Sequence, residues 1–257
     1  MTRTDADVAA IALATLDLTD LGESTSQENA VALAARAAEH GTAAVCVWPR
    51  FVAASAQALA GTGVKVATVV NFPSGDEAVA DVRAMTEQAV ADGADEIDVV
   101  LPYRAFLAGE ADSAREVLEA VVAASGTAAV KVIIESGELS STEAITAAAE
   151  LAIEAGTDFV KTSTGKSPIS ATPEAAEAIL AVIAARPAGS APVGFKASGG
   201  VRSVDDARIY IEIADRLLGE DWITPDTFRF GASSLLDDIL RVLDGEASAA
   251  PDSPTAY

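Results

Sequence analysis

The sequence predicts a single-domain (β/α)8 barrel, and three observations favour this fold. Eight short runs rich in Val, Ile and Phe alternate with Ala-rich helical runs along the chain. The length of 257 residues matches the roughly 250 that one such barrel needs. No G-x-G-x-x-G motif follows the first apolar run, so a doubly wound dinucleotide-binding sheet is the less favoured arrangement.

The eight predicted strands are short, and several are continuous apolar runs without polar alternation. That pattern is typical of parallel strands that are covered on both faces. The predicted ranges are Thr15–Thr19, Ala44–Trp48, Val66–Phe72, Glu96–Leu101, Val130–Glu135, Phe159–Thr162, Val193–Ala197 and Phe228–Gly231.

Helical segments lie between these strands. The clear examples are Glu28–Glu39, Asp76–Asp92, Asp112–Ala124, Thr142–Ala155, Pro173–Ala185, Val204–Leu217 and Ser233–Leu243. Ser141 and Thr172 stand where helix N-caps are expected, and Pro173 follows Thr172 at a first-turn position that tolerates proline. We expect one barrel domain over residues 1–244, followed by a flexible tail over 245–257 that is rich in Ala, Ser and Pro.

Composition excludes several classes of function. A formal net charge of −22 argues against a nucleic-acid partner, because phosphate backbones require a basic surface. No apolar run approaches the roughly 20 residues that span a bilayer, and the first residues lack the form of a signal peptide. Cys46 is the only cysteine, which rules out an internal disulfide and favours a cytoplasmic enzyme.

Neither a metal nor a nucleotide cofactor is expected. His40 is the only histidine, and it fits a helix end before Gly41 better than a metal site. Gly165-Lys166-Ser167 resembles the end of a P-loop, but Val160 stands where that motif requires its first glycine.

Polar residues at or near the ends of predicted strands are the candidate catalytic groups, because barrel enzymes carry their active sites there. They are Asp17, Asn71, Asp98, Glu135, Lys161 and Lys196. A lysine is nucleophilic only when neutral, and both low dielectric and a neighbouring ammonium lower its pKa. Lys161 and Lys196 on adjacent strands, with Asp98, therefore suit imine formation with a carbonyl substrate. A structural ion-pair cluster inside the barrel is the alternative.

The chain contains only five lysines, so those that remain are expected to have functional roles. Drift in base composition would also deplete lysine, but it would not select which lysines survive.

Two glycine- and serine-containing loops are candidate phosphate sites. Ala197–Gly200 follows the seventh strand, and Gly231–Ser234 follows the eighth and leads into a helix. Loops at these positions often bind phosphate through backbone N–H groups at a helix N-terminus. The alternative is that these are ordinary turn glycines.

Eight motifs, in order from Asp17 to about Leu243, resemble those of the deoxyribose-phosphate aldolase family. Two of them contain the lysines, namely Phe159–Lys166 and Gly194–Arg202. The other six are Leu16–Thr19, Val45–Arg50, Ala67–Pro73, Glu96–Arg104, Lys131–Glu135 and Phe228–Ser234.

The resemblance implies a barrel fold, no cofactor, and cleavage of 2-deoxy-D-ribose 5-phosphate to acetaldehyde and D-glyceraldehyde 3-phosphate. It implies that Lys161 forms a Schiff base, that Lys196 lowers the pKa of Lys161, and that Asp98 assists proton transfer through water. Asp17 would position a sugar hydroxyl, and the terminal Tyr257 would aid proton transfer. The implied phosphate site comprises Gly199, Gly200, Ser233 and Ser234, with Thr164, Lys166 and Gly231 nearby. The implied pocket lining is Leu21, Phe72 and Phe195, and a homodimer would fit the family.

Three other readings stay open. An aldolase for another short phosphorylated sugar would keep both lysines and change the pocket near Asp17 and Phe72. A barrel could bind a sugar phosphate without catalysis, and an acidic scaffold protein would do neither. The pairing of Lys161 with Lys196 argues against the two non-catalytic readings.

Overall fold

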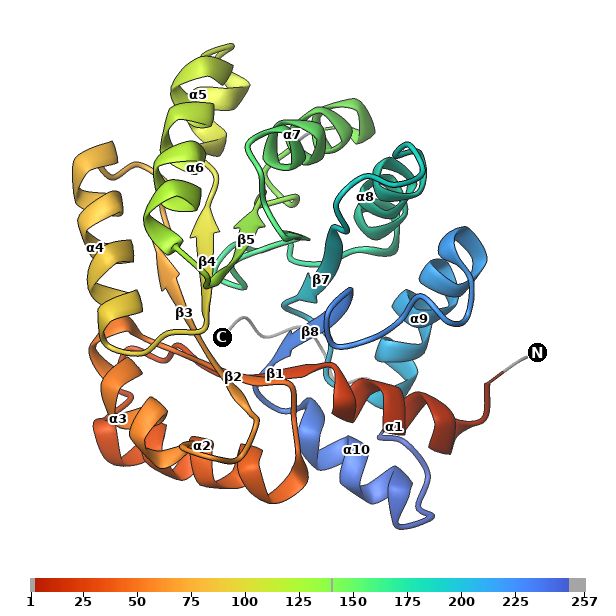
Figure 1. The fold of residues 1–257 in the computed structure, drawn as a ribbon. Helices are drawn as coiled ribbons and strands as arrows, with labels where there is room; N and C mark the ends of the chain where they lie inside the picture. Colours follow the sequence, from red (N-terminus) through yellow and green to blue (C-terminus); the bar gives the residue numbers. More distant parts are fainter. Residues whose placement is uncertain (1–2, 140, 250–257) are drawn as a thin grey trace.

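Eight parallel strands close into a barrel in the computed structural model, which describes residues 3–139 and 141–249. Each strand pairs with its neighbours in sequence, and β8 returns to pair with β1. Helices surround the barrel as an outer layer (Figure 1). The predicted (β/α)8 fold is therefore confirmed.

All eight predicted strands are present, and their ends lie within two residues of the predicted ones. Their bounds are β1 Leu16–Asp20, β2 Ala44–Val47, β3 Lys65–Val70, β4 Glu96–Val100, β5 Ala129–Ile133, β6 Phe159–Lys161, β7 Gly194–Ser198 and β8 Phe228–Ala232.

The seven predicted helices are also present. They are α2 Gln27–His40, α4 Val79–Ala91, α6 Ala111–Ser125, α7 Thr142–Glu154, α8 Pro173–Ala184, α9 Val204–Leu218 and α10 Leu235–Leu243. Three helices, α1 Asp5–Ala14, α3 Val52–Ala58 and α5 Tyr103–Leu107, were not predicted, nor was the 3₁₀ turn η1 Pro49–Phe51. The expected helix caps form, since the hydroxyls of Ser141 and Thr172 accept hydrogen bonds from the backbone N–H groups of Ala144 and Ala175.

Helix α1 precedes the barrel and packs against α9 and α10. A capping box starts it, because Thr4 and Asp7 exchange hydrogen bonds between their side chains and backbone N–H groups. Arg3 adds an ion pair to Asp215 on α9, with 2.7 Å between Nε and Oδ2. These contacts attach the N-terminal helix to the last two helices of the chain.

Asp238 on α10 ties two distant backbone segments together. Its carboxylate accepts hydrogen bonds from the backbone N–H of Val204, at the start of α9, and from Ser248 and Ala249. Residues 245–249 of the predicted tail thus include an anchored segment, and residues 250–257 lie outside the described part. The predicted domain boundary at residue 244 stays a prediction.

The inward face of the barrel is divided between small and long side chains. One side carries a small apolar cluster of Leu21, Ala44, Cys46, Ala67 and Val69. The other side carries four long buried cationic side chains, one from each of the consecutive strands β5 to β8. These are Lys131, Lys161, Lys196 and Arg229. Small residues on β2 and β3 leave the interior volume that these long side chains occupy.

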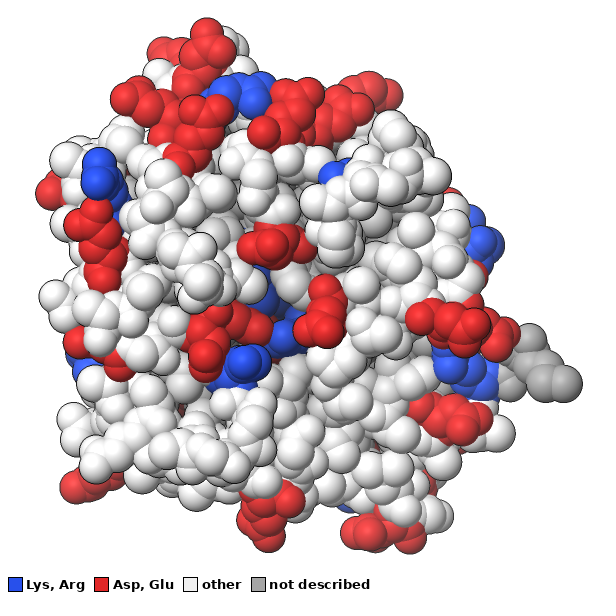
Figure 2. All heavy atoms as spheres, viewed as in Figure 1, with Lys and Arg blue, Asp and Glu red and all other residues white. Residues whose placement is uncertain are grey.

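Among the charged side chains on the face of the molecule in Figure 2, acidic groups outnumber basic ones, as the net charge of −22 leads one to expect. Among the residues that the structure describes, no helix is long and apolar enough to cross a bilayer.

Raising KCl from low to molar concentration should raise the melting temperature, because salt screens repulsion among surface carboxylates. Differential scanning calorimetry at several KCl concentrations measures this, with NaCl as a check on ion identity. A melting temperature that does not change with salt would show that surface repulsion does not limit stability.

Gly194→Ala should lower the free energy of unfolding by about 3 kcal/mol, near the upper end of overpacking costs. A Cβ at this position would lie 2.3 Å from the ring of Phe159 and 2.7 Å from the carbonyl oxygen of Thr227. Gly41→Ala is the matched control, because its Cβ meets open space and only the left-handed φ of 70° opposes it, at about 1 kcal/mol. Urea unfolding compares the two, and an equal loss would contradict the steric explanation.

Candidate active site

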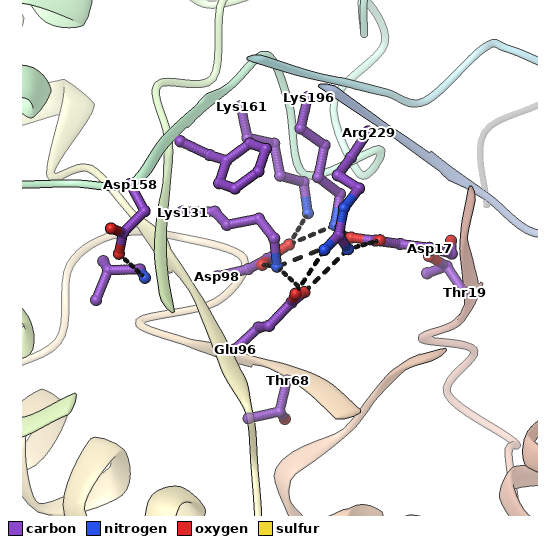
Figure 3. A network of polar contacts seen from close by, with 12 residues as sticks. Asp17, Thr19, Thr68, Glu96, Asp98, Lys131, Asp158, Lys161, Lys196 and Arg229 are labelled. Atoms are coloured by element: carbon purple, nitrogen blue, oxygen red, sulfur yellow. Dashed lines mark hydrogen bonds and ion pairs between the residues drawn. The ribbon is translucent and has the colours of Figure 1, made fainter. Parts of the chain in front are cut away.

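Four predicted catalytic groups from four different strands meet inside the barrel (Figure 3). Asp98 Oδ2 lies 2.8 Å from Lys161 Nζ and 2.8 Å from Lys196 Nζ. Lys196 also forms an ion pair with Asp17 on β1. The strand register explains the meeting, because Lys161 and Lys196 are directly paired across β6 and β7. The fold therefore brings together the four residues that were predicted from the sequence.

Three further charged residues, which the sequence reading did not select, extend this cluster toward the N-terminal ends of the strands. Lys131 Nζ lies 2.5 Å from Glu96 Oε2 and 2.9 Å from Asp98 Oδ1. The guanidinium of Arg229 binds Asp17 at 2.5 Å and Glu96 at 2.7 Å. The sequence did contain a signal for these three residues, because each is a charged residue inside an apolar strand. Glu96 also stands two positions before Asp98, so both side chains point to the same face of β4.

We name these seven residues the buried charge cluster, which comprises Asp17, Glu96, Asp98, Lys131, Lys161, Lys196 and Arg229. It contains four cationic groups and three carboxylates, so full ionisation leaves one positive charge in excess. Within the described chain, Lys161 pairs with one carboxylate, whereas each of the other three cations pairs with at least two. Loss of the Lys161 proton is therefore the least costly way to neutralise the cluster.

The directions of the pKa shifts agree with this charge count. Burial and the Lys196 ammonium lower the pKa of Lys161 below its usual value, against the opposing effect of Asp98. For Lys196, the attraction of Asp17 and Asp98 outweighs burial and raises the pKa. Burial opposes ionisation of Asp98, but the three lysines around it hold its pKa well below the usual range. One lysine is thus prepared to act as a neutral amine beside a permanent cation.

Glycine on β8 makes room for the side chain of Lys196. A Cβ at Gly231 would lie 3.0 Å from Lys196 Cε and 2.6 Å from Ser198 Oγ. A side chain there would crowd both Ser198 and Lys196. Glycine is therefore required at position 231 for packing, in addition to the expected place of Gly231 near the phosphate.

Two of the three predicted pocket residues lie on the apolar side of the barrel mouth. Leu21 belongs to the small inner cluster, and Phe72 packs against it beside Trp48. Phe195 lies elsewhere, fully buried in the main core with its ring 5.6 Å from that of Phe228. Because Lys196 faces inward, its neighbour Phe195 faces the surrounding helices.

The predicted phosphate-binding residues follow β6, β7 and β8. Gly199 and Gly200 have φ of 80° and 85°, which favours glycine. Ser233 and Ser234 are exposed, and no side-chain hydrogen bond caps the N-terminus of α10 that follows them. Backbone N–H groups at such a terminus suit an anion. The roles of these residues stay predictions.

Lys166 lies at the same mouth, where its Nζ donates to the carbonyl oxygen of Leu21 at 2.9 Å. Thr164, two residues earlier, accepts a hydrogen bond from the backbone N–H of Lys166. Tyr257, the remaining predicted catalytic residue, lies outside the described residues. In the described ranges, no cluster of three or more His, Cys, Asp or Glu side chains could hold a metal ion.

A barrel with a depressed-pKa lysine at its mouth is the arrangement of a lysine-dependent lyase. The family model for DeoC/LacD family aldolases matches residues 11–241. The chain belongs to this family.

Known relatives agree with that membership. A deoxyribose-phosphate aldolase from Agrobacterium fabrum is 48% identical over 246 residues, which cover 93% of each chain. A crystal structure from Coccidioides immitis, provisionally named a deoxyribose-phosphate aldolase, is 30% identical with a TM-score of 0.82, covering 91% of this chain and 86% of that one. The tetrameric deoxyribose phosphate aldolase from Aeropyrum pernix, at 24% identity, shares the fold with a TM-score of 0.75 over 93% and 92% of the two chains.

Replacing Lys196 by the neutral Met should raise the pKa of Lys161, because a repelling ammonium is lost and Asp98 becomes free to attract the Lys161 ammonium. Only the neutral amine attacks a carbonyl, so imine formation should shift to higher pH. At pH 7 its rate should fall at least about tenfold, equivalent to about 1.4 kcal/mol.

The measurement is the pH dependence of borohydride trapping with acetaldehyde. Lys196→Arg, which keeps a cation, should shift the profile less, and Lys65→Met on the exposed start of β3 should leave it unchanged. A Lys196→Met profile that matches the parent protein would show that Lys196 does not set the protonation of Lys161.

Proposed function

We propose that the protein is a class I aldolase that reversibly cleaves 2-deoxy-D-ribose 5-phosphate to acetaldehyde and D-glyceraldehyde 3-phosphate. One observation carries the mechanism: Lys161 is the cation of the buried charge cluster with a single carboxylate partner, and its pKa is lowered. The name of the 48% identical Agrobacterium relative supports the substrate.

In the cleavage direction, the neutral Nζ of Lys161 attacks the C1 aldehyde of the open-chain sugar. Loss of water from the resulting carbinolamine gives an iminium ion. The C3 hydroxyl then loses its proton to the Asp98 carboxylate through a water, while the electrons of the C2–C3 bond move toward the iminium. This step releases glyceraldehyde 3-phosphate and leaves an enamine on Lys161.

The proton that Asp98 received returns to the terminal carbon of the enamine and restores an iminium, and water hydrolyses this iminium to acetaldehyde and the free lysine. The Lys196 ammonium stays charged throughout, because Asp17 and Asp98 raise its pKa. It keeps Asp98 ionised between turnovers and disfavours protonation of the free Lys161 amine. Asp17, which is held by Lys196 and Arg229, would position a sugar hydroxyl.

The distal phosphate would be held at the mouth by Gly199, Gly200, Ser233 and Ser234, with Lys166 as the nearby cation. A helix N-terminus and one lysine explain how a strongly acidic protein could hold a phosphorylated sugar. We further propose a role in deoxyribose phosphate catabolism, a cytoplasmic location and a homodimer. A second candidate is an aldolase for another short phosphorylated sugar, which a panel of phosphosugars would separate from the first.

Lys161→Ala should reduce turnover of 2-deoxyribose 5-phosphate by about four orders of magnitude or more, because the covalent nucleophile is lost. Borohydride added with substrate should label the parent protein once, at Lys161, as read by peptide mass spectrometry. Lys65→Ala, which changes an exposed lysine at the opposite end of a strand, should keep both activity and label. A label at another lysine, or full activity of Lys161→Ala, would refute the proposed nucleophile.

A further inference from the structure

Glu135 is a buried carboxylate that the proposed reaction does not use. It follows β5 by two residues, is 1% exposed, and adopts a left-handed backbone with φ of 51°. Non-glycine residues rarely adopt this conformation, and such positions persist where the surrounding structure enforces them. The strained turn at Glu135 therefore requires an explanation.

The Glu135 carboxylate is occupied by the loop that follows β6. Its oxygens accept hydrogen bonds from Thr164, at 2.5 Å from the hydroxyl and 3.2 Å from the backbone N–H. A backbone hydrogen bond from Ser136 to the carbonyl oxygen of Thr162, at 2.8 Å, reinforces the connection. Glu135 forms no ion pair within the described part of the chain, but its charge still interacts with Lys161 of the buried charge cluster.

These contacts continue from Thr164 to Lys166. With its hydroxyl hydrogen directed to Glu135, Thr164 Oγ1 accepts the backbone N–H of Lys166 at 3.0 Å. Lys166 then reaches across the mouth, where its Nζ lies 2.9 Å from the Leu21 carbonyl oxygen. Glu135 thus fixes the backbone of Lys166 through Thr164.

Thr164 itself is not free to bind an anion in this arrangement. Both of its donors, the hydroxyl and the backbone N–H, point to Glu135. Burial raises the pKa of the Glu135 carboxyl group, and the hydrogen bonds from Thr164 oppose this rise because they stabilise the ionised form. Lys166 is then the charged donor that this loop can offer to a phosphate.

We propose that Glu135 is a positioning residue that holds Thr164 and Lys166 in the conformation that selects phosphorylated over unphosphorylated sugars. The proposal rests on the proposed function, because it assigns a determinant of selectivity to that same site. It predicts that loss of Glu135 affects recognition of the phosphate and leaves chemistry at Lys161 intact.

The test compares 2-deoxyribose 5-phosphate with 2-deoxyribose as substrates. Glu135→Ala should raise KM for the phosphorylated sugar about tenfold, while kcat/KM for 2-deoxyribose and the rate of borohydride trapping with acetaldehyde change less than about twofold. Glu135→Gln, whose amide oxygen can still accept from Thr164, should recover most of the loss. Glu150→Ala on the exposed side of α7 is the matched control.

Thr164→Val provides a second variant if Glu135→Ala is unstable, because it removes the hydroxyl and keeps the backbone N–H. It should raise KM for the phosphorylated sugar in the same direction and by less. An equal loss on both substrates, or an unchanged KM for the phosphorylated sugar in a folded variant, would overturn the proposal. A parent protein that forms the imine with acetaldehyde but does not cleave 2-deoxyribose 5-phosphate would instead refute the proposed function.

Discussion

The ionic contacts around Asp98 are the constraint on which the rest of the barrel interior depends. Asp98 is fully buried and contacts three lysines from three strands. Removing one partner from such a group leaves an uncompensated charge, at a cost of about 3–5 kcal/mol, so the members of the cluster stabilise one another. The excess of one cation is what allows a single lysine to be neutral while the others stay charged.

Barrel geometry makes this cluster possible. Long cationic side chains from β5 to β8 extend across the interior toward the carboxylates on β1 and β4. Alanine and cysteine on β2 and β3 keep that space open, and Gly231 lets Lys196 pass. A barrel lined by large aliphatic residues on every strand would exclude the same ionic contacts.

The fold and the centre of the site could be predicted because their signals are local. Apolar runs and helix caps located the strands and most helices, and lysines inside apolar strands indicated the site. Helices α1, α3 and α5 were missed, and the last two span only seven and five residues, which gives helical periodicity little length to appear. Arg229 and Lys131 were not selected because they stand away from the carboxyl ends of their strands, where the catalytic groups of barrels are expected. Phe195 was expected in the pocket, whereas strand alternation directs it outward.

The anchoring of residues 248–249 by Asp238 changes how the C-terminal segment can be shortened. The boundary expected at residue 244 suggests that everything after it is dispensable, yet the same carboxylate also receives the backbone N–H of Val204 at the start of α9. Deleting residues 245–257 would remove two hydrogen-bond donors from that carboxylate along with the terminal tyrosine. A truncation that isolates the contribution of Tyr257 should therefore keep the chain through Ala249.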